Sequence, residues 1–462
     1  MSSSSGAQCQ VAVRGAQDVF LLSANENTFF KTTYARATNF AVTEIEMPFN
    51  NAAGFGRQKF SCTVSRAGDL LSSMYVAITL PPILYPAAIG GVSLYNPTAA
   101  VPSYAYWVNT IGHAILQEVD VNIGQHEYDS HYGEFLEIFE AVSAPSDRLL
   151  QEMTGRYNST IECAQASLLE QHLYVPLKFW FNRFTEQSLP LVALYWHDTT
   201  LTFSTRPRSA LFSASGAAAA DLALAAPTIT VPTDVSDMHM LCNFVYLDRP
   251  ERAAFANSKS EYVIDQTQTL GQEAVTLTST TINHNARFNH PVTELLWVIR
   301  QNAAVAANDW FNFNGGIAVV PNLVGIVGAP SLVTDPFESA AILINNQNRT
   351  IDHPAIYYRT VQMLQSHNRF PASDRKIYCY SFGLKPEELL HTGSVNMSRL
   401  DSSYVQVTYH STDPILPAVA GNFLLFARNK NGMFYIPLFN TLTTHNSVMK
   451  ITVGMAGLKF AA

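Results

Sequence analysis

The segment LLSSMYVAITLPPILYPAAIGG, residues 70–91, decides between a membrane protein and a β protein, because it is apolar and carries no formal charge. The charge-free run continues from Leu70 to Gln117. A membrane-spanning helix needs roughly 20 apolar residues with an unbroken ladder of backbone hydrogen bonds. Pro81 and Pro82 interrupt that ladder, since each lacks a backbone donor and clashes with the preceding helical turn. The first half of the segment is rich in branched and aromatic residues and predicts a β-strand that ends at the two prolines.

Two further segments bear on the relation of the chain to membranes. Residues 313–335 form a second low-charge region, and glycines and prolines interrupt it in the same way. The N-terminal sequence MSSSSGAQCQ is polar and lacks the charged-then-apolar order of a secretory signal. We therefore expect a protein that is soluble, or kept soluble by assembly.

The composition indicates a protein with much of its surface covered. Charged residues make up 14% of the 462 residues, against a usual value of about 25%. A free monomer normally needs more surface charge to stay in solution, so the composition favours a subunit of a larger assembly. The length allows two or more all-β domains, which reach ~200–250 residues each. The net charge of −8 and the scattered Lys and Arg argue against direct nucleic-acid binding.

The cysteines give no sign of a metal site or a disulfide framework. Structural zinc sites need closely paired ligands, and a disulfide scaffold shows a dense, even set. The sequence has no Cys-x-x-Cys pair. We therefore expect no metal, no cofactor and reduced, mostly buried thiols at the five cysteines, which are Cys9, Cys62, Cys163, Cys242 and Cys379.

Strand signals dominate the rest of the chain. Apolar and polar residues alternate in EVDVNI (118–123), TLTFS (200–204) and YVQVTY (404–409), which predicts strands with one face turned inward. Helix signals are few and short. GEFLEIFEAV (133–142) carries an apolar stripe, and RPERAAFANS (249–258) is typical of a short connector. Many short strands with little helix predict β-sandwiches or jelly rolls.

The predicted helix at 133–142 carries three glutamates, Glu134, Glu137 and Glu140. Their spacing places them on a common face, and we expect that face to be exposed to solvent. A glycosidase would need two carboxylates facing one cleft, and nothing in the sequence selects such a pair. The aromatic cluster FWF (179–181) is expected in a core rather than in a sugar-binding site.

A weak internal repeat divides the chain into halves. VDVNIGQHEYDSH and AILINNQNRTIDH share an apolar strand, a polar turn and a histidine. Two more pairs follow, and in one of them PLKFWFN and KIYCYSF are each predicted to be a strand dense in aromatic residues. Chance matches among strands are common, so the repeat alone does not establish a duplication. The similar pairs keep the same order in both halves: 119–131 with 341–353, 176–182 with 376–382, and 196–203 with 401–409.

Two short motifs resemble ligand-binding signatures without meeting their requirements. HEYDSH (126–131) has two histidines five apart beside a predicted strand end, whereas a zinc-protease helix needs them four apart. AGFGRQK (53–59) lacks the Gly-Lys-Ser/Thr ending and the strand-to-helix context of a phosphate loop. We therefore predict no catalytic, cofactor-binding or metal-binding residues. The sequence has three Asn-x-Ser/Thr sequons, at Asn158, Asn348 and Asn396. We predict glycosylation there only if the chain is exposed to glycosylating enzymes.

Several longer motifs follow one another over nearly the whole chain. GAQDVFLLSANENTFFKTTYARATNFA (15–41) and FGRQKFSCTVSRAGDLLSSMYVAITLP (55–81) come first, and YLDRPERAAFANSKSEYVIDQTQ (246–268) lies between the halves. The later motifs are at 189–198, 290–301, 382–388, 393–402 and 454–460. In this order the motifs resemble the major capsid proteins of nucleocytoplasmic large DNA viruses, a group that includes iridoviruses, phycodnaviruses and marseilleviruses. Ala253 and Ala254 depart from that pattern, because arginines are common there.

The resemblance implies an all-β double jelly roll, which is two tandem eight-stranded β-sandwiches with a few short helices in loops and at the junction. The expected divisions are an N-terminal segment at 1–30, a first jelly roll at 31–248, a connector at 249–258 and a second jelly roll at 259–462. An alanine-rich insertion at 211–234 departs from the family pattern.

The function implied by the resemblance is structural and not enzymatic. Homotrimers with a pseudo-hexagonal outline would tile the icosahedral shell of a large double-stranded DNA virus over an internal membrane. The expected partners are further copies of the chain, minor capsid and penton proteins and the nearby viral membrane, without direct nucleic acid. The expected location is the virion, after synthesis in the host cytoplasm. Two alternatives are a jelly-roll carbohydrate-active enzyme and a lectin-like, carbohydrate-binding attachment protein.

Overall fold

The computed structural model divides the chain into two units, Met1–Asn39 and Phe40–Ala462. Every element below belongs to the second unit, whereas Cys9 and the expected N-terminal segment 1–30 lie outside the described residues. The described residues are 38–85, 95–96, 103–143, 147–224, 228–257, 260–275, 279–314, 335–369, 371, 375–410, 421–436 and 457–458.

The first half of the second unit is a sandwich of two antiparallel sheets. One sheet has the strand order β1-β11-β3-β7, with the short β8 (Leu189–Pro190) on β3, and the other has the order β2-β9-β5-β6. Numbered along the chain, the eight main strands read 1-8-3-6 and 2-7-4-5, which is the order of a jelly roll. Their bounds are Phe40–Met47 (β1), Phe60–Thr63 (β2), Leu70–Leu80 (β3), Leu116–Ile123 (β5), His126–Tyr132 (β6), Gln171–Pro176 (β7), Thr199–Thr205 (β9) and Asp237–Leu247 (β11).

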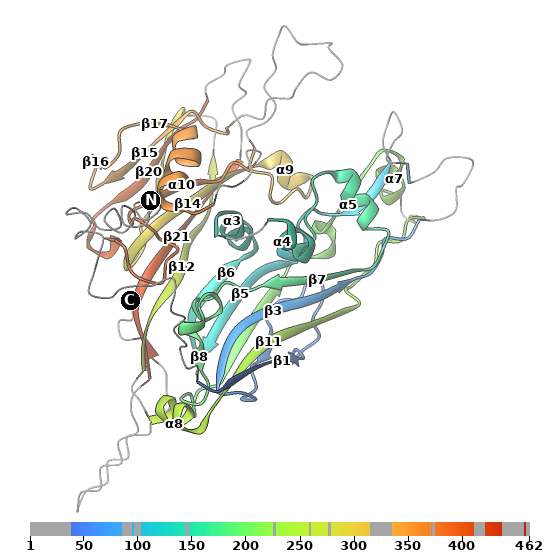
Figure 1. Cartoon of the computed structure of the whole chain (residues 1–462). Coiled ribbons are helices and arrows are strands. Elements are labelled where there is room, and N and C mark those ends of the chain that lie inside the picture. Colours follow the sequence, from blue (N-terminus) through green and yellow to red (C-terminus); the bar gives the residue numbers. More distant parts are fainter. Residues whose placement is uncertain are drawn as a thin grey trace, which may run out of the picture. The chain divides into compact units, whose positions relative to one another are not determined.

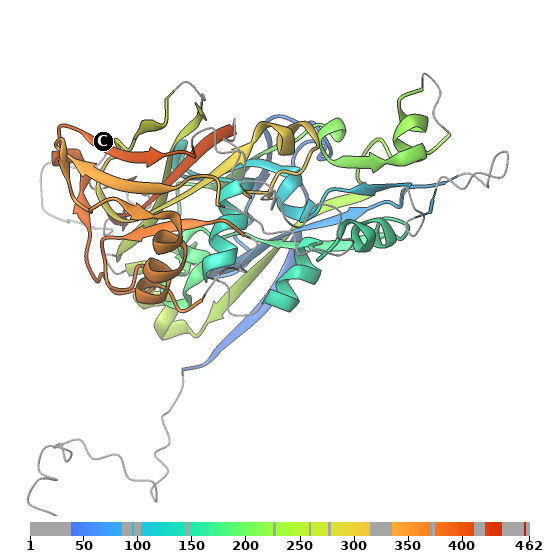
Figure 2. The ribbon, with the colours of Figure 1, turned by 90° about the horizontal axis from the view of Figure 1, so that it is seen from above.

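The second half repeats this topology. Its sheets have the orders β12-β21-β14-β18 and β13-β20-β15-β16, which again read 1-8-3-6 and 2-7-4-5. The short strands β17 (His353–Pro354), β19 (Val395–Asn396) and β22 (Gly457–Leu458) pair with β15, β14 and β21. The main strands are Ser260–Val275 (β12), Thr281–Asn285 (β13), Pro291–Gln301 (β14), Ser339–Ile344 (β15), Gln347–Asn348 (β16), Tyr378–Ser381 (β18), Ser403–Thr408 (β20) and Gly421–Ile436 (β21). Figures 1 and 2 show the two halves side by side.

Short helices occupy the connections between strands, and α8 lies at the junction of the halves. A two-stranded sheet of β4 (Tyr104–Trp107) and β10 (Phe212–Ser215) accompanies them in the first half. Among the described residues, no helix has the length and apolarity needed to cross a membrane. The described α-helices are Ile111–Ile115 (α2), Gly133–Ser143 (α3), Asp147–Thr154 (α4), Thr160–Ala166 (α5), Trp180–Arg183 (α6), Gly216–Leu222 (α7), Arg249–Asn257 (α8), Asn302–Ala306 (α9) and Gln362–Ser366 (α10).

Strand β3 shows why the apolar segment that begins at Leu70 can be free of charge. It lies inside its sheet between β11 and β7, and its alternate residues Met74, Val76 and Ile78 are buried in the core. The strand ends where Pro81 can no longer donate to the ladder, and the Pro81 carbonyl instead accepts a hydrogen bond from Trp107 Nε1 at 3.2 Å. The predicted strand is therefore confirmed.

Each half has its own apolar core. In the first, Phe60 and Phe203 stack with their ring centroids 5.5 Å apart between the two sheets. In the second, Trp297 packs edge-on against Tyr358 at 5.1 Å. Two closed sandwiches with few and short helices confirm the predicted fold class.

The internal repeat found in the sequence has a structural basis, with one error. Its first pair falls on the hairpins β5–β6 and β15–β16, and its last pair on β9 and β20, which hold equal places in the two jelly rolls. The segment 176–182 is not the aromatic strand that we predicted. Strand β7 ends at Pro176, and Trp180 begins helix α6, because proline ends the ladder and the rings then turn into the core.

Candidate functional site at the junction of the two sandwiches

Helix α3 joins the two halves through an apolar contact. It follows β6 of the first sandwich, and its residues Phe135, Ile138 and Phe139 pack in one cluster with Leu296 of β14 and Phe426 of β21. The ring centroids of Phe135 and Phe426 are 5.7 Å apart. The sheet that carries β14 therefore has two buried faces, one toward its own core and one toward α3 (Figure 1).

The glutamates of α3 are buried, so their predicted exposure to solvent was wrong. Glu134, Glu137 and Glu140 are 5%, 4% and 8% exposed. The apolar stripe of the helix faces the second sandwich, and the glutamates face cations that come from both halves. A helical pattern distinguishes polar from apolar residues, but it does not show whether the polar face meets water or other charges.

Glu134 connects the halves directly. Its Oε1 accepts hydrogen bonds from Arg206 of the first half at 2.7 Å and from Arg300 in β14 at 2.8 Å. Both guanidinium groups lie over the ring of Trp310, at 4.6 and 5.1 Å. Burial would raise the pKa of Glu134, but the charges of Arg206 and Arg300 outweigh it and hold the pKa below its ordinary value.

Glu137 forms a second ion cluster one turn further along α3. Its carboxylate lies 2.8 Å from His113 Nδ1 and 2.9 Å from Arg375 Nη2. His113 Nε2 lies 3.3 Å from Glu140 Oε2, which is an ion-pair distance without the alignment of a hydrogen bond. Burial would lower the pKa of His113, but Glu140 and Glu137 raise it to about 9. The imidazole is therefore charged at neutral pH, and Arg375 ties the cluster to the second half.

A third cluster crosses the junction near α6. Arg183 of the first half donates to Asp265 Oδ2 in β12 at 2.7 Å and to the Glu387 carbonyl at 3.1 Å. Arg428 in β21 approaches the same Asp265 oxygen at 3.3 Å and also pairs with Glu294 in β14. Burial, and then the neighbouring charge of Arg428, lower the pKa of Arg183 to about 10.

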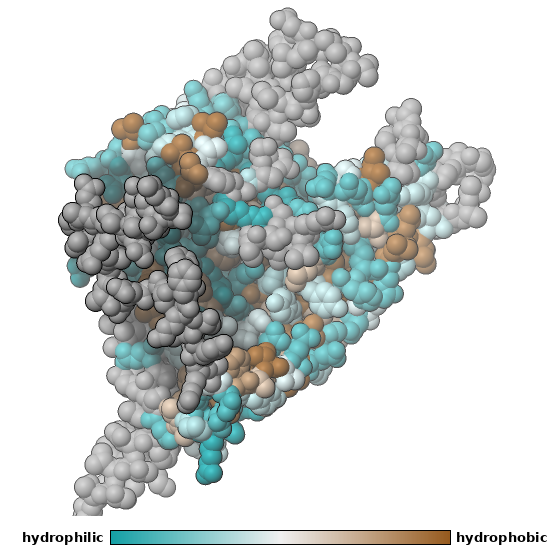
Figure 3. Space-filling view, in the orientation of Figure 1, coloured by the Kyte–Doolittle hydropathy of each residue, from teal (hydrophilic) through white to brown (hydrophobic). Residues whose placement is uncertain are grey.

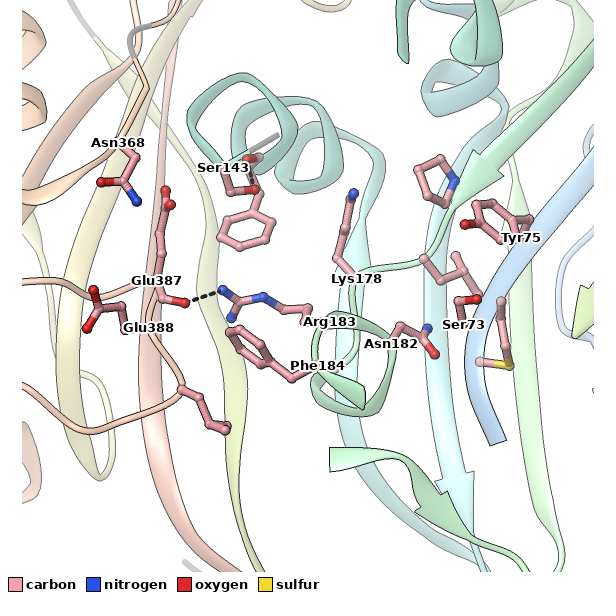
Figure 4. A pocket seen from close by; sticks show the side chains of 15 residues that line it. Ser73, Tyr75, Ser143, Lys178, Asn182, Arg183, Phe184, Asn368, Glu387 and Glu388 are labelled. Atoms are coloured by element: carbon pink, nitrogen blue, oxygen red, sulfur yellow. Dashed lines mark hydrogen bonds between the residues drawn. The ribbon is translucent and has the colours of Figure 1, made fainter. Parts of the chain in front are cut away.

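A cavity of about 460 Å³ lies beside the third cluster. Lys178 and Arg183 line it from the first half, and Asn368 and Glu387 from the second (Figure 4). Burial lowers the pKa of Lys178, and Arg183 acts in the same direction. Arg183 and Glu387 are committed to ion pairs and hydrogen bonds. The buried side-chain amide of Asn182, which also lines the cavity, has no hydrogen-bond partner among the described residues.

The remaining residues named from the sequence lie apart from the junction clusters or from one another. His126 is exposed, whereas His131 is buried, pairs with Asp129 at 3.0 Å and stacks on Phe179, so HEYDSH does not bring its two histidines together. The FWF cluster is buried, as are four free cysteines, Cys62, Cys163, Cys242 and Cys379. The three sequon asparagines are exposed: Asn158 before α5, Asn348 in β16 and Asn396 in β19.

Two sandwiches of one strand order, joined through buried ion clusters, define a double jelly-roll protein. Comparison with known families identifies which one. Residues 28–248 match the family described as major capsid protein N-terminus, and residues 251–457 match the large eukaryotic DNA virus major capsid protein. The chain therefore belongs to the major capsid proteins of large eukaryotic DNA viruses, which confirms the resemblance seen in the sequence.

Individual relatives match over nearly the full chain. The major capsid protein of Paramecium bursaria Chlorella virus 1 is 30% identical over 479 residues, covering 99% of each chain. That of Phaeocystis pouchetii virus is 28% identical over 553 residues, also covering 99% of each. A chain of the quasi-atomic PBCV-1 virus capsid is 25% identical with a TM-score of 0.69, covering 94% of this chain and 100% of that one.

We predict that Glu134→Gln lowers the free energy of unfolding by about 3–5 kcal/mol at neutral pH, because it leaves two buried guanidinium groups without a counter-charge. The carboxylate has a lowered pKa in the folded state. Its contribution is therefore present above its unfolded pKa of about 4.3 and is lost as the pH falls toward the folded value. Urea unfolding at several pH values measures this, and the two proteins should converge in acid.

Glu170→Gln is the matched control, because the Glu170 side chain is 53% exposed. Its effect should stay within about 0.5 kcal/mol. Equal stabilities of Glu134→Gln and the wild-type chain at neutral pH would show that the junction charges do not stabilise the fold.

Proposed function

We propose that this chain is the main structural subunit of a viral capsid, that it resides in the virion shell and that it catalyses no reaction. The observation that supports this best is the repeat of one eight-strand topology in two sandwiches joined by buried ion pairs. Its relatives are named as capsid proteins, and a similar chain belongs to the PBCV-1 virus capsid. The carbohydrate-active alternative is not favoured by these matches.

The proposed assembly unit is a homotrimer. Three copies of a chain with two similar sandwiches present six similar sandwiches around one axis, which gives a near-hexagonal outline suited to tiling a shell. Closed symmetric contacts would bury apolar area within the trimer, and weaker, more polar contacts would join trimers. Figure 3 shows apolar residues in separate patches among hydrophilic surface. Independently of that view, the exposed apolar side chains of the described residues include Phe40, Val42, Ile356, Leu364, Leu384 and Leu390.

We further propose how the chain divides into domains and which components of the virion it contacts. We assign 31–248 and 259–462 to the two jelly rolls and 249–258 to their connector, which contains α8 (Arg249–Asn257). The segment 1–30 is assigned to interior contacts with minor capsid proteins or the membrane side, penton proteins are further neighbours, and synthesis takes place in the host cytoplasm. The net charge of −8 supports the absence of direct contact with nucleic acid.

We predict that the purified full-length chain is a trimer. Light scattering coupled to size-exclusion chromatography should give three times the mass of the 50.9 kDa chain, and electron micrographs should show particles with threefold symmetry. A stable monomer under native conditions, without such particles, would contradict the proposal. A glycan array run with the same sample tests the lectin-like alternative, which predicts selective binding.

The three exposed sequons are proposed as glycosylation sites, because exposure is the first requirement for modification of a folded chain. Asn396 differs from the others, since its side-chain oxygen accepts a hydrogen bond from Ser398 N at 3.1 Å within its own sequon. Peptide mass spectrometry of chain isolated from virions should find carbohydrate at Asn158 and Asn348 with higher occupancy than at Asn396. Unmodified asparagines at all three positions would rule the assignment out.

A further inference from the structure

Three side chains of types that coordinate metal ions lie close together in the second sandwich, on the face that α3 covers. Glu294 comes from β14, His367 follows α10 and Cys379 lies in β18. His367 Nε2 is 3.2 Å from Cys379 Sγ and 3.1 Å from Glu294 Oε2. One candidate ligand atom from each side chain lies within 4.8 Å of the other two, and none of the three side chains is exposed.

The groups around the cluster orient its atoms toward a common point. His367 Nδ1 lies 2.7 Å from Glu387 Oε1, which directs Nε2 toward Glu294 and Cys379. Carboxylates orient metal-bound histidines in this way. Arg428 engages the other oxygen of Glu294, Oε1. Glu294 Oε2 is buried and has no aligned hydrogen bond among the described residues, and its nearest charged neighbour is His367 Nε2 at 3.1 Å.

The spacing of these atoms fits a small tetrahedral metal ion. Zinc binds His nitrogen and carboxylate oxygen at about 2.0–2.2 Å and Cys sulfur at about 2.3 Å, which separates adjacent tetrahedral ligands by roughly 3.3–3.6 Å. The observed separations of 3.1 and 3.2 Å need to widen by only a few tenths of an ångström. A nitrogen, a sulfur and an oxygen ligand together favour zinc over magnesium or calcium, which prefer oxygen alone.

We propose that Glu294, His367 and Cys379 bind a structural Zn²⁺ ion, with a water molecule in the fourth position. The ion binds the thiolate of Cys379 and the neutral Nε2 of His367, and protons held there are released to solvent on binding. Arg428 remains paired with Glu294 and Asp265. The ion would fasten the end of α10 to β14 and β18, next to the ion pairs that join the two sandwiches.

Complete burial separates this site from a catalytic one. The Cys379–His367–Glu387 geometry resembles an activated nucleophile, but a thiol with no exposed surface cannot meet a substrate. Burial also implies that zinc enters as the second sandwich folds and leaves when it unfolds. The expected behaviour is therefore retention of zinc by the native protein during dialysis against a chelator.

The test uses full-length chain expressed in zinc-supplemented medium and dialysed against EDTA. Elemental analysis should find about one Zn²⁺ per chain in the wild type and in Cys163→Ser, and almost none in Cys379→Ser, because thiolate ligation is lost. Cys163 is the matched control, since it is also a buried free cysteine but lies outside the cluster. Wild-type chain without zinc, or Cys379→Ser that retains it, would overturn the proposal.

A second readout covers the case in which Cys379→Ser fails to fold. Wild-type chain unfolded with chelator and refolded with Co²⁺ should show a thiolate-to-cobalt absorption band, and its absence would overturn the proposal without any variant. Glu387→Gln should keep the band but weaken metal affinity by about 10–100-fold, because it removes only the group that orients His367. An unchanged affinity would contradict the role assigned to Glu387.

Discussion

The carboxylate of Glu134 is buried at the junction and receives one guanidinium group from each sandwich, Arg206 and Arg300. An uncompensated charge in such a place would cost several kcal/mol, so the halves are strongly favoured in the one position where both cations reach it. Apolar packing of α3 on β14 and β21 supplies attraction, but it is not directional. The ion pairs are directional and therefore fix the orientation of the two sandwiches. The Arg183–Asp265 ion pair near α6 joins the two sandwiches in the same way.

A fixed relation between the sandwiches is what a shell subunit requires. Small errors in the angle between two halves would accumulate over many copies in a lattice, so contacts inside the subunit must be stiffer than contacts between subunits. The distribution of charge is consistent with this division. Several charged residues are buried at the junction, including Glu134, Arg300 and Arg428, whereas apolar side chains such as Leu364 and Leu384 are exposed.

Sequence reasoning predicted the sandwiches well because strands carry a local signal. The alternation in β5 and β20 and the proline stop of β3 depend on residues that are neighbours in the chain. The junction depends on residues far apart in the chain, and it was missed. A usable signal did exist in HPVTELLWVIRQ (290–301), since Glu294 and Arg300 are isolated charges in an otherwise apolar strand and such charges require buried partners. The cluster of Glu294, His367 and Cys379 has no motif spacing, so only folding brings it together.

If the buried charges fix the junction, the two sandwiches form one cooperative unit. Hydrogen exchange under increasing denaturant tests it directly, with amides of β3 reporting on the first sandwich and amides of β14 on the second. We expect one shared opening transition in both strands, with equal free energies and equal denaturant dependence. Opening of β14 at clearly lower denaturant, while β3 stays protected, would instead show two independent domains.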